Sequence, residues 1–420
     1  MKKDTIKSIV VLSCICLVVA ILLSGVNAIT DPIIKKAASD AASSAYGDVL
    51  PGASELEEIT GEFPETVKKV MKDKGGKGFI FELATKNGYT KNEIAMVLGI
   101  GADGVITKLD ITVYPESKGS EAEFEALFAG KTADMNDVIA GTTITSNALK
   151  AAVKDAYDVY YDHAGVEKSD EQKLQDLYEV LMPEAKDKSG AYNFTAVELP
   201  TDAPASITSI YKPSTEIGYI MTAKVNDLSL AIALNAYGKA YAVYDLDGND
   251  LSADSAYDSV KSDAENTMPS IYEANHDNIL ELMVNEEIIT SASSAQKVDF
   301  GAVSSRVVAV YKLKNGNAYI ANADGFGGVL TVCYVINSKG EIVNYATLSH
   351  SERDNEYEQK DYGTVIGFDS YAQRFDGKTT SSVDDDTLLI AGSTFTTNAT
   401  KACWESIKAA NEIINGEVKG

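Results

Sequence analysis

A threefold internal repeat limits the possible folds of this chain more than any other feature of its sequence. The three copies open alike, with YGDVLP at residues 46–51, YEVLMP at residues 178–183 and ILELM at residues 279–283. Each opening is followed by a polar stretch and then by short runs in which apolar and polar residues alternate. Such a repeat predicts several small units built on one plan. The length of 420 residues also favours two or three domains.

The alternating runs predict antiparallel hairpins, because apolar residues recur with a period of two and the runs are broken by turns that contain glycine. They cover residues 77–89 and 93–114 in the first copy, 217–225 and 230–248 in the second, and 317–328 and 329–348 in the third. Each copy should therefore form a small antiparallel sheet. Helical patterns accompany these sheets, so the predicted fold class is α+β with three repeated sheet-plus-helix units.

An N-terminal segment has the properties of a membrane anchor. Three lysines in the first seven residues precede an apolar run over residues 9–29, which is about the length that a spanning helix requires. Lysines on that side predict a cytoplasmic N-terminus and an extracytoplasmic position for the rest of a single-pass cell-membrane protein. Two alternatives remain open: cleavage by a signal peptidase after Ala28, and a lipid anchor on Cys14.

The charge of the chain excludes a nucleic-acid partner. There are 62 acidic and 37 basic residues, which give a formal net charge of −25, whereas binding to phosphate backbones requires a basic surface. The three histidines and four cysteines do not have the spacing of a zinc site or of a disulfide framework. We therefore predict neither a metal site nor catalysis by acid–base residues.

Two threonine-rich segments are the strongest local signal for a binding site. Residues 140–148 (AGTTITSNA) and 391–399 (AGSTFTTNA) are identical at six of nine positions, and each precedes an amphipathic helical pattern. At the start of a helix, backbone N–H groups and the helix dipole favour an anion such as phosphate. The alternative is that these hydroxyl and amide side chains only cap the helices. The occurrence of two such copies favours a binding site.

With these features the chain resembles the FMN-binding domain family, whose members include the flavin-bearing membrane subunits of Rnf-type ferredoxin:NAD oxidoreductases and of sodium-pumping NADH:quinone reductases. That family has an N-terminal anchor, a Gly-Tyr-Gly-Gly-like strand element, a Glu-Thr-Pro-Gly-like loop and an Asp-x-x-Ser/Thr-Gly-Ala-Thr motif. The last threonine of the motif carries FMN through a phosphoester bond. The resemblance therefore implies FMN as the cofactor, a flavin transferase for maturation, and other membrane subunits of a redox-driven ion pump as partners.

In the first copy, the motif of the family corresponds to residues 137–143 and keeps the aspartate, the glycine and the acceptor threonine, Thr143. Ala140 stands where the family has Ser or Thr, and Thr142 stands where it has Ala. The strand element corresponds to residues 88–89 and the acidic loop to residues 114–119. The cofactor-binding residues predicted in this copy are Asp137, Gly141, Thr142, Thr143, Ile144, Thr145, Ser146, Glu116 and Gly119.

In the third copy, the glycine and the threonine are kept, so Thr394 is a second candidate for covalent FMN. Leu388 stands where the motif has aspartate. The strand element corresponds to residues 325–328. The other cofactor-binding residues predicted here are Gly392, Ser393, Thr396, Thr397 and Glu352. The second copy lacks the threonine motif and is predicted to be degenerate.

The predicted organisation is an N-terminus with its anchor at residues 1–30, an FMN-binding unit at 31–165, a degenerate unit at 166–276 and an FMN-binding-like unit at 277–420. The predicted function is electron transfer by covalent FMN, in a membrane-anchored subunit of an ion-translocating Rnf-type complex. Two other functions stay open. One is a free-standing extracellular FMN-dependent reductase, and the other is a flavin-free module that only binds partners.

Overall fold

The structure is a computed structural model that describes residues 46–133, 139, 141–299, 301, 303–352 and 369–416, together with Val19, Ser24 and Thr30. Apart from Val19 and Ser24, the predicted anchor at residues 9–29 lies outside the described residues. Asp137 and Ala140 lie outside them as well. Over the part that is described, no helix combines the length and the apolar character needed to cross a membrane.

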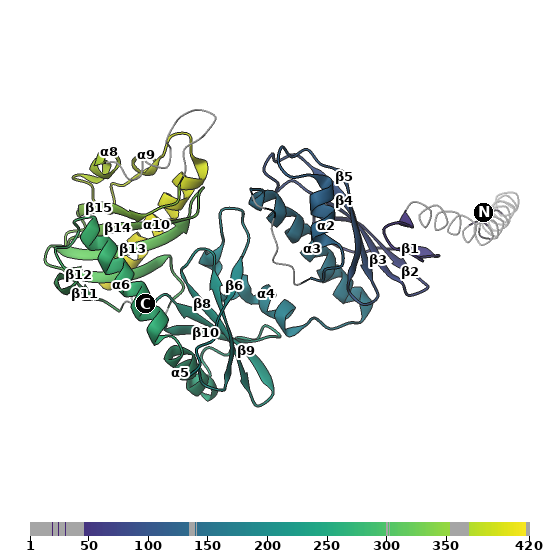
Figure 1. The fold of residues 1–420 in the computed structure, drawn as a ribbon, viewed down its shortest axis with the longest axis horizontal. Helices are drawn as coiled ribbons and strands as arrows, with labels where there is room; N and C mark the ends of the chain where they lie inside the picture. Colours follow the sequence, from purple (N-terminus) through teal and green to yellow (C-terminus); the bar gives the residue numbers. More distant parts are fainter. Residues whose placement is uncertain are drawn as a thin grey trace, which may run out of the picture. The chain divides into compact units, whose positions relative to one another are not determined.

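The chain divides into two compact units, Met1–Glu167 and Lys168–Gly420. The first unit contains one five-stranded antiparallel sheet and the second contains two (Figure 1). In each sheet, every strand pairs with its neighbour in the chain. Three such sheets with helices confirm the predicted α+β class and agree with a threefold repeat.

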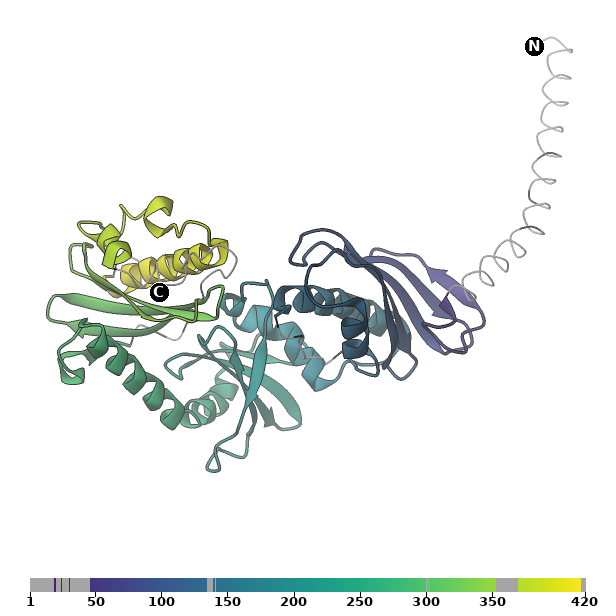
Figure 2. The same ribbon diagram turned by 45° about the horizontal axis from the view of Figure 1, so that its top comes forward.

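The sheet of the first unit forms one core with two helices. Its strands are β1 (Leu56–Ile59), β2 (Val67–Asp73), β3 (Gly78–Thr85), β4 (Ile94–Gly101) and β5 (Ile106–Val113), and its helices are α2 (Glu121–Phe128) and α3 (Thr143–Ala164). Helix α3 lies against one face of the sheet (Figure 2). There Phe81 and Leu98 of the sheet belong to one buried cluster with Phe124 of α2 and Val153 of α3. Full burial of each such side chain contributes roughly 1.5–3 kcal/mol to stability.

The second unit begins with a helix and the sheet of the second copy. These elements are α4 (Asp170–Leu181), β6 (Phe194–Val197), β7 (Ile207–Pro213), β8 (Gly218–Val225), β9 (Leu228–Asn235), β10 (Ala240–Asp245), α5 (Asp258–Asn266) and α6 (Pro269–Asn285). Helix α5 packs on one face of this sheet, where Val260 and Ala264 join Ile232 and Met221 in a buried cluster. In the other two copies, the long helix that packs on the sheet begins at a threonine, Thr143 or Thr394; in this copy α5 packs on the sheet instead.

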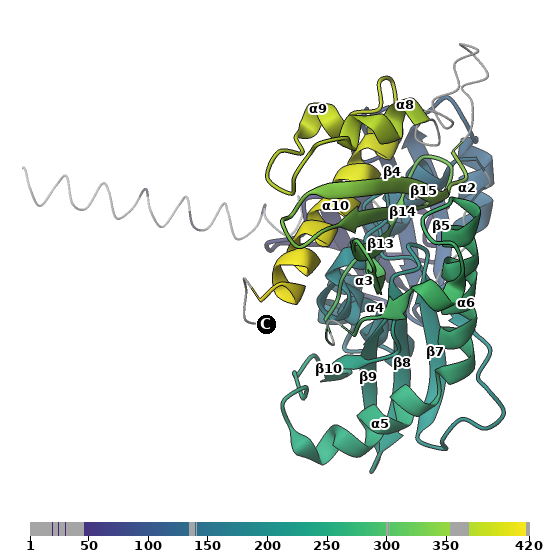
Figure 3. The same ribbon diagram turned by 90° about the vertical axis from the view of Figure 1, so that its left-hand side faces the viewer.

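The sheet of the third copy completes the second unit. Its elements are β11 (Gln296–Lys297), β12 (Val307–Leu313), β13 (Gly316–Asp324), β14 (Val329–Ile336), β15 (Ile342–Ser349), α8 (Asp369–Ala372), α9 (Asp385–Leu388) and α10 (Thr394–Ile414). Helix α10 packs on one face of this sheet, with Cys403 and Ile407 buried against Tyr319 and Tyr334. On the other face lies α6 (Figure 3).

One hydrophobic core is shared by both sheets of the second unit. It contains Ile220 from one sheet, Ile320 from the other, Leu181 of α4 and Met283 of α6. The repeated openings at 178–183 and 279–283 thus supply the apolar residues with which α4 and α6 enter this core. In the first unit, Leu50 of the corresponding opening is buried against the sheet. The repeated openings therefore have a packing role, because each buries apolar residues against a sheet.

The predicted hairpins correspond to the last three strands of each sheet, but the sequence did not predict the first two. The first strands are only four, four and two residues long, and most of their residues are exposed or half-buried. The second strands, such as β2 with the sequence VKKVMKD, lack a regular alternation. Register shifts in β2, β7 and β12 explain this, because a bulge changes which residues face the core.

Candidate functional site

The first threonine segment forms a tight turn that ends at the start of α3. Gly141 has a φ of +80°, a left-handed conformation that favours glycine, and it is followed by Thr142 as the N-cap. The Thr142 side chain makes no capping bond to the helix; its hydroxyl donates to the Ile139 carbonyl at 2.9 Å. The Ile139 N–H in turn donates to Ser146 Oγ at 3.2 Å. No side-chain cap from Thr142 therefore occupies the N–H groups at this helix start, which suits an anion.

Exposure distinguishes Thr143 from its hydroxyl-bearing neighbours. Thr142, Thr145 and Ser146 are buried, and Ile144 is half-buried, whereas Thr143 is exposed. The Thr142 and Ser146 hydroxyls also lie 3.1 Å apart and share a hydrogen bond. A modifying enzyme that approaches from solvent can therefore reach Thr143 but not these neighbours.

The second threonine segment, at the start of α10, repeats the glycine turn and one hydrogen bond of the first. Gly392 has a φ of +82°, and Ser393 is an N-cap without a side-chain capping bond. The Ile390 N–H donates to Thr397 Oγ1 at 3.0 Å, as the Ile139 N–H does to Ser146 in the first unit. Thr394 is exposed, whereas the neighbouring Thr396 and Thr397 are buried. The two segments thus present one exposed threonine each, in the same place.

In the first unit, the acidic loop joins the strand element to the helix start. The Glu116 carboxylate accepts hydrogen bonds from the N–H of Thr90 at 3.2 Å and from its hydroxyl at 3.2 Å. A Cβ on Gly88 would lie less than 3.0 Å from Glu116 Oε1, so the Glu116 carboxylate packs directly against this glycine and would have to shift for a larger residue. Further along the loop, a Cβ on Gly119 would lie 3.3 Å from Thr142 Cγ2. The loop that contains Glu116 and Gly119 therefore contacts residue 88 at one point and the turn before Thr143 at another.

In the third copy, Glu352 makes the corresponding connection with an additional bond. Its carboxylate accepts from the N–H groups of Phe326 and Gly327, both at 3.2 Å, and from the Thr396 hydroxyl at 2.6 Å. A Cβ on Gly325 would lie less than 3.0 Å from Glu352 Oε1. The Ser393 and Thr396 hydroxyls lie 2.6 Å apart. Glu352 thus ties the glycine-rich loop directly to the first turn of α10.

Tyr114 supports the acidic loop of the first unit. Its hydroxyl donates to the Lys118 carbonyl at 2.6 Å, and its ring packs against Phe124 with the ring centroids 5.8 Å apart. Burial, followed by the negative charges of Glu116 and Glu123, raises the pKa of Tyr114 to about 12. The phenol is therefore protonated near pH 7, as its hydrogen bond to the Lys118 carbonyl of the loop requires.

A cavity of about 240 Å³ adjoins the first turns of α10. Phe395 and Asn398 line it, and the Phe395 ring lies 6.2 Å from the Phe326 ring between centroids. Lys188 also lines the cavity, and its ammonium donates to the Phe326 carbonyl at 2.6 Å. The other lining residues are Lys186, Asp187, Arg306, Ala323, Asp324, Ala399 and Ala402. This site therefore combines aromatic surface with positive and negative charges beside Thr394.

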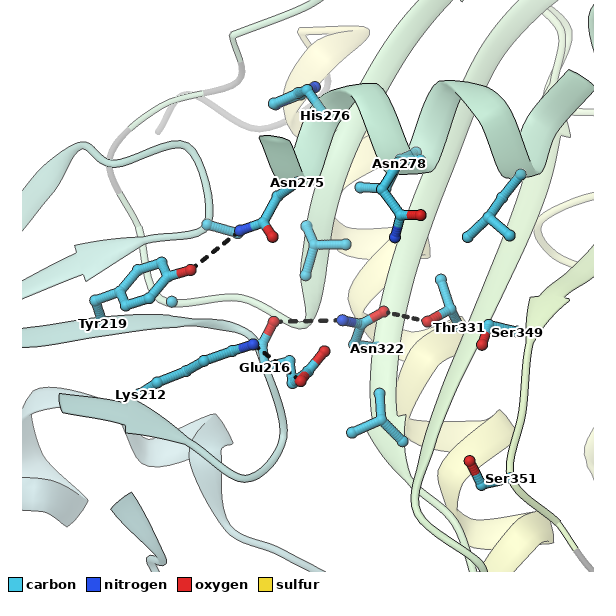
Figure 4. Close-up of a pocket in the computed structure, with 16 residues that line it drawn as sticks. Lys212, Glu216, Tyr219, Asn275, His276, Asn278, Asn322, Thr331, Ser349 and Ser351 are labelled. Carbon is cyan, nitrogen blue, oxygen red and sulfur yellow. Dashed lines mark hydrogen bonds and ion pairs between the residues drawn. The ribbon is translucent and has the colours of Figure 1, made fainter. Parts of the chain in front are cut away.

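A cavity of about 380 Å³ lies between the two sheets of the second unit, beside α6 (Figure 4). Asn322 is central to it: its amide donates to the Glu216 carbonyl at 3.3 Å and accepts from the Thr331 hydroxyl at 2.9 Å. An ion pair between Lys212 and Glu216, with N and O 2.9 Å apart, lies at its edge. A lining of amides and hydroxyls suits water or a small polar molecule better than the flat ring of a flavin. The threonine turns remain the better cofactor sites.

Sequence reasoning missed several residues that hold the two turns together. Thr90, which donates to Glu116, and Phe395, beside Thr394, were not predicted. Comparing the two copies position by position would have placed Phe395 opposite Ile144, inside the predicted segment. Leu388, at the aspartate position of the third copy, is buried, and its carbonyl accepts from Thr400 Oγ1 at 3.1 Å. This position therefore carries a core residue and no carboxylate.

Comparison with known proteins agrees with a flavin site in the first unit. The model of the FMN-binding domain family matches residues 88–158, a range that begins at Gly88 and includes Glu116 and Thr143. No curated protein matches the chain. An FMN-binding domain at these residues suggests a flavin-binding, electron-transfer role.

Proposed function

We propose that this protein is a membrane-anchored electron carrier that holds FMN covalently on Thr143, with Thr394 as a second attachment site. One observation carries the proposal: an exposed threonine lies two residues after a left-handed glycine, at a helix start where the N-cap Thr142 makes no side-chain capping bond, inside the range matched by the FMN-binding domain. The same arrangement recurs at Thr394. FMN supplies one- and two-electron transfer, and the protein supplies position and electrostatics.

The residues of the first unit fit the cofactor in distinct roles. The Thr143 hydroxyl is the attachment point, and the helix N-terminus favours the charge of the phosphate. Attachment forms a bond between Thr143 Oγ1 and the flavin-side phosphorus of a flavin dinucleotide and breaks its phosphoric anhydride bond, so that the nucleoside monophosphate leaves and the hydroxyl proton is released. Gly141 lets the backbone turn before the helix. Glu116 fixes the neighbouring loop through Thr90. In the third copy, Thr394, Gly392 and Glu352 take these roles.

The partners and the location are part of the same proposal. The lysine-flanked apolar run at residues 9–29 supports a single-pass anchor in the lipid bilayer with the bulk of the chain outside the cytoplasm. The resemblance to the flavin-bearing membrane protein of Rnf-type complexes supports a position in an ion-translocating electron transport complex. Its partners are then the other membrane subunits of that redox-driven pump, with a flavin transferase acting during maturation.

A second function is favoured by a specific observation. The two threonine turns share the left-handed glycine and one hydrogen bond, although the second lies outside the range matched by the FMN-binding domain. Two flavins on one chain suit a free-standing extracellular reductase that passes electrons to an outside acceptor. Purification from the native membrane separates the two functions, because a member of a complex retains other membrane proteins and a free-standing reductase does not.

The experiment that tests the proposal is intact-mass and peptide analysis of the full chain, purified in detergent after co-expression with a flavin transferase. We expect one added FMN on the Thr143 peptide, and a second on the Thr394 peptide. Thr143→Ala and Thr394→Ala should each remove the corresponding FMN. Thr112→Ala and Ser381→Ala, at exposed hydroxyl residues outside the two threonine segments, are the matched controls and should keep it. Absence of covalent flavin from the unaltered chain would leave a flavin-free binding module as the function.

A further inference from the structure

Two aromatic side chains stand out on the described surface. Among the large hydrophobic residues that are exposed in the described part of the chain, Tyr89 at 60% and Phe326 at 52% are the two aromatic ones; the others are valines and one leucine. Large aromatic side chains are usually buried for most of their surface, because exposure forgoes their hydrophobic stabilisation. An exposed ring that occurs twice in one chain therefore requires an explanation.

The two rings occupy the same place in their sheets. Each lies in the connection between the third and the fourth strand, directly after a buried glycine. Those glycines, Gly88 and Gly325, are the two that closely approach the site glutamates. In the second copy, which lacks the threonine segment, the corresponding connection is a short turn of Asn226 and Asp227 with positive φ angles. An exposed ring in this connection therefore occurs in the two copies that have a threonine segment, and the copy without the segment has a short turn instead.

Contacts place Phe326 beside the first turn of α10, the helix that begins at Thr394. Its N–H donates to Glu352 at 3.2 Å, and Glu352 accepts from Thr396 in the first turn of α10 at 2.6 Å. Its ring lies 6.2 Å from that of Phe395, the residue after Thr394, with 34° between the ring planes. Two phenyl rings thus form an aromatic surface at the end of α10 where Thr394 lies.

The first unit repeats this arrangement with fewer rings. Tyr89 stands between Gly88 and Thr90, both of which contact Glu116, and the loop of Glu116 reaches Thr142 through Gly119. Ile144, half-buried, takes the place of Phe395. Tyr89 is the one exposed Tyr, Phe or Trp among the described residues of the first unit, and it lies in the loop that Glu116 contacts.

We propose that Tyr89 and Phe326 are positioning residues on which the isoalloxazine ring of the attached flavin stacks, one in each site. The inference rests on the proposed function, because it requires flavin on Thr143 and Thr394. Aromatic rings prefer offset-stacked or edge-to-face contact, and such contact stabilises a pair beyond the area that it buries. Without such stacking, the ring of a flavin held only through its phosphate would rotate freely about the flexible chain that joins ring and phosphate. Stacking fixes the ring where electrons enter and leave.

The test uses the full chain with flavin attached at one site at a time, obtained with Thr394→Ala for the first site and Thr143→Ala for the second. Intact mass reports attachment, and the anisotropy of flavin fluorescence reports whether the ring turns with the protein. In the first background, Tyr89→Ala should keep the added mass and lose anisotropy. The ratio of held to free ring should fall about fivefold, which corresponds to about 1 kcal/mol. Tyr89→Phe should keep both.

Matched controls use exposed aliphatic residues elsewhere in the same units. Val166→Ala in the first unit and Val343→Ala in the third copy should leave mass and anisotropy unchanged, since neither side chain lies in the connection after Gly88 or Gly325. In the second background, Phe326→Ala should lose anisotropy and Phe326→Tyr should keep it.

Each other outcome identifies what has failed. Unchanged anisotropy in both alanine variants with the flavin attached would overturn the stacking role and assign the rings to docking of a redox partner. Loss of the added mass in a folded Tyr89→Ala protein would also overturn it, because the ring would then serve the transferase. If the Thr394→Ala and Thr143→Ala parents carry no flavin, the proposed function itself fails.

Discussion

The Thr396 hydroxyl donates a 2.6 Å hydrogen bond to the carboxylate of Glu352, and this single contact joins a sheet loop to the first turn of α10. Glu352 also accepts from two N–H groups of the glycine-rich loop. In the first unit, Glu116 holds the corresponding loop through Thr90. A carboxylate near a helix N-terminus is itself favourable, because the helix dipole is positive there. The glutamates therefore shape both sites before any cofactor is attached.

Replacing Glu352 with alanine should loosen the glycine-rich loop and destabilise the second unit. Hydrogen bonds to charged groups contribute roughly 1.5–3 kcal/mol each, and several are lost here together. We expect a loss of about 2–3 kcal/mol in the free energy of unfolding, measured by urea titration of the second unit's transition. Glu352→Gln retains one oxygen acceptor and should lose less. Equal stability of the alanine variant and the unaltered protein would show that these bonds contribute nothing net.

Alanine at Gly88 should displace the Glu116 carboxylate from its position beside Thr90. The added Cβ would lie less than 3.0 Å from Glu116 Oε1 and 2.9 Å from Ile94 Cδ1. Both atoms end flexible side chains that can turn away, so the main cost is loss of the hydrogen bonds from Thr90 to Glu116, each of which contributes about 1.5–3 kcal/mol. The control is Gly61→Ala, where the nearest atom would be 3.5 Å away in ordinary contact. Thermal unfolding should separate the two variants, and equal melting temperatures would contradict the predicted clash.

Gly141→Ala tests backbone strain alone at the flavin turn. No atom of the described residues lies within 4 Å of the added Cβ, so the expected effect comes from the left-handed φ of +80°. That conformation costs a residue with a Cβ roughly 1–2 kcal/mol. We expect a stability loss of this size together with reduced flavin attachment at Thr143, since the turn that presents the hydroxyl changes. Gly392→Ala should act in the same way on Thr394. Full attachment in both variants would show that the left-handed turn is dispensable.

Stability of the first unit should depend on the ionisation of Asp73 at low pH. Burial disfavours the charged form, but backbone N–H bonds from Lys77, Ser54 and Glu55 outweigh it, so the pKa of Asp73 lies below its usual value. A lowered folded-state pKa stabilises the fold above the unfolded pKa, and that stability is lost as pH falls from about 4 towards the folded value. Asp73→Asn should flatten this part of the stability profile. An unchanged slope below pH 4 would contradict it.

Much of the fold was predictable because local patterns determine it. The strands from β3 to β5, with their counterparts, are short runs rich in apolar residues that turns separate, and the two threonine segments mark the starts of α3 and α10. The contact of Gly88 with Glu116 was not predictable, because it joins loops 28 positions apart whose approach depends on the whole sheet. The cavity around Asn322 was missed for the same reason, since two sheets and a helix form it.

The core that joins both sheets of the second unit determines which parts of the chain can unfold separately. Residues 277 onward begin inside α6, whose Ile279 and Met283 are buried together with residues from both sheets. Cutting between the second and third copies would therefore expose that core, whereas the first unit keeps a core of its own. Calorimetry should accordingly resolve two cooperative melting transitions from a chain with three copies. A shortened protein could therefore lack the first copy alone, but the second and third copies would have to be kept or lost together.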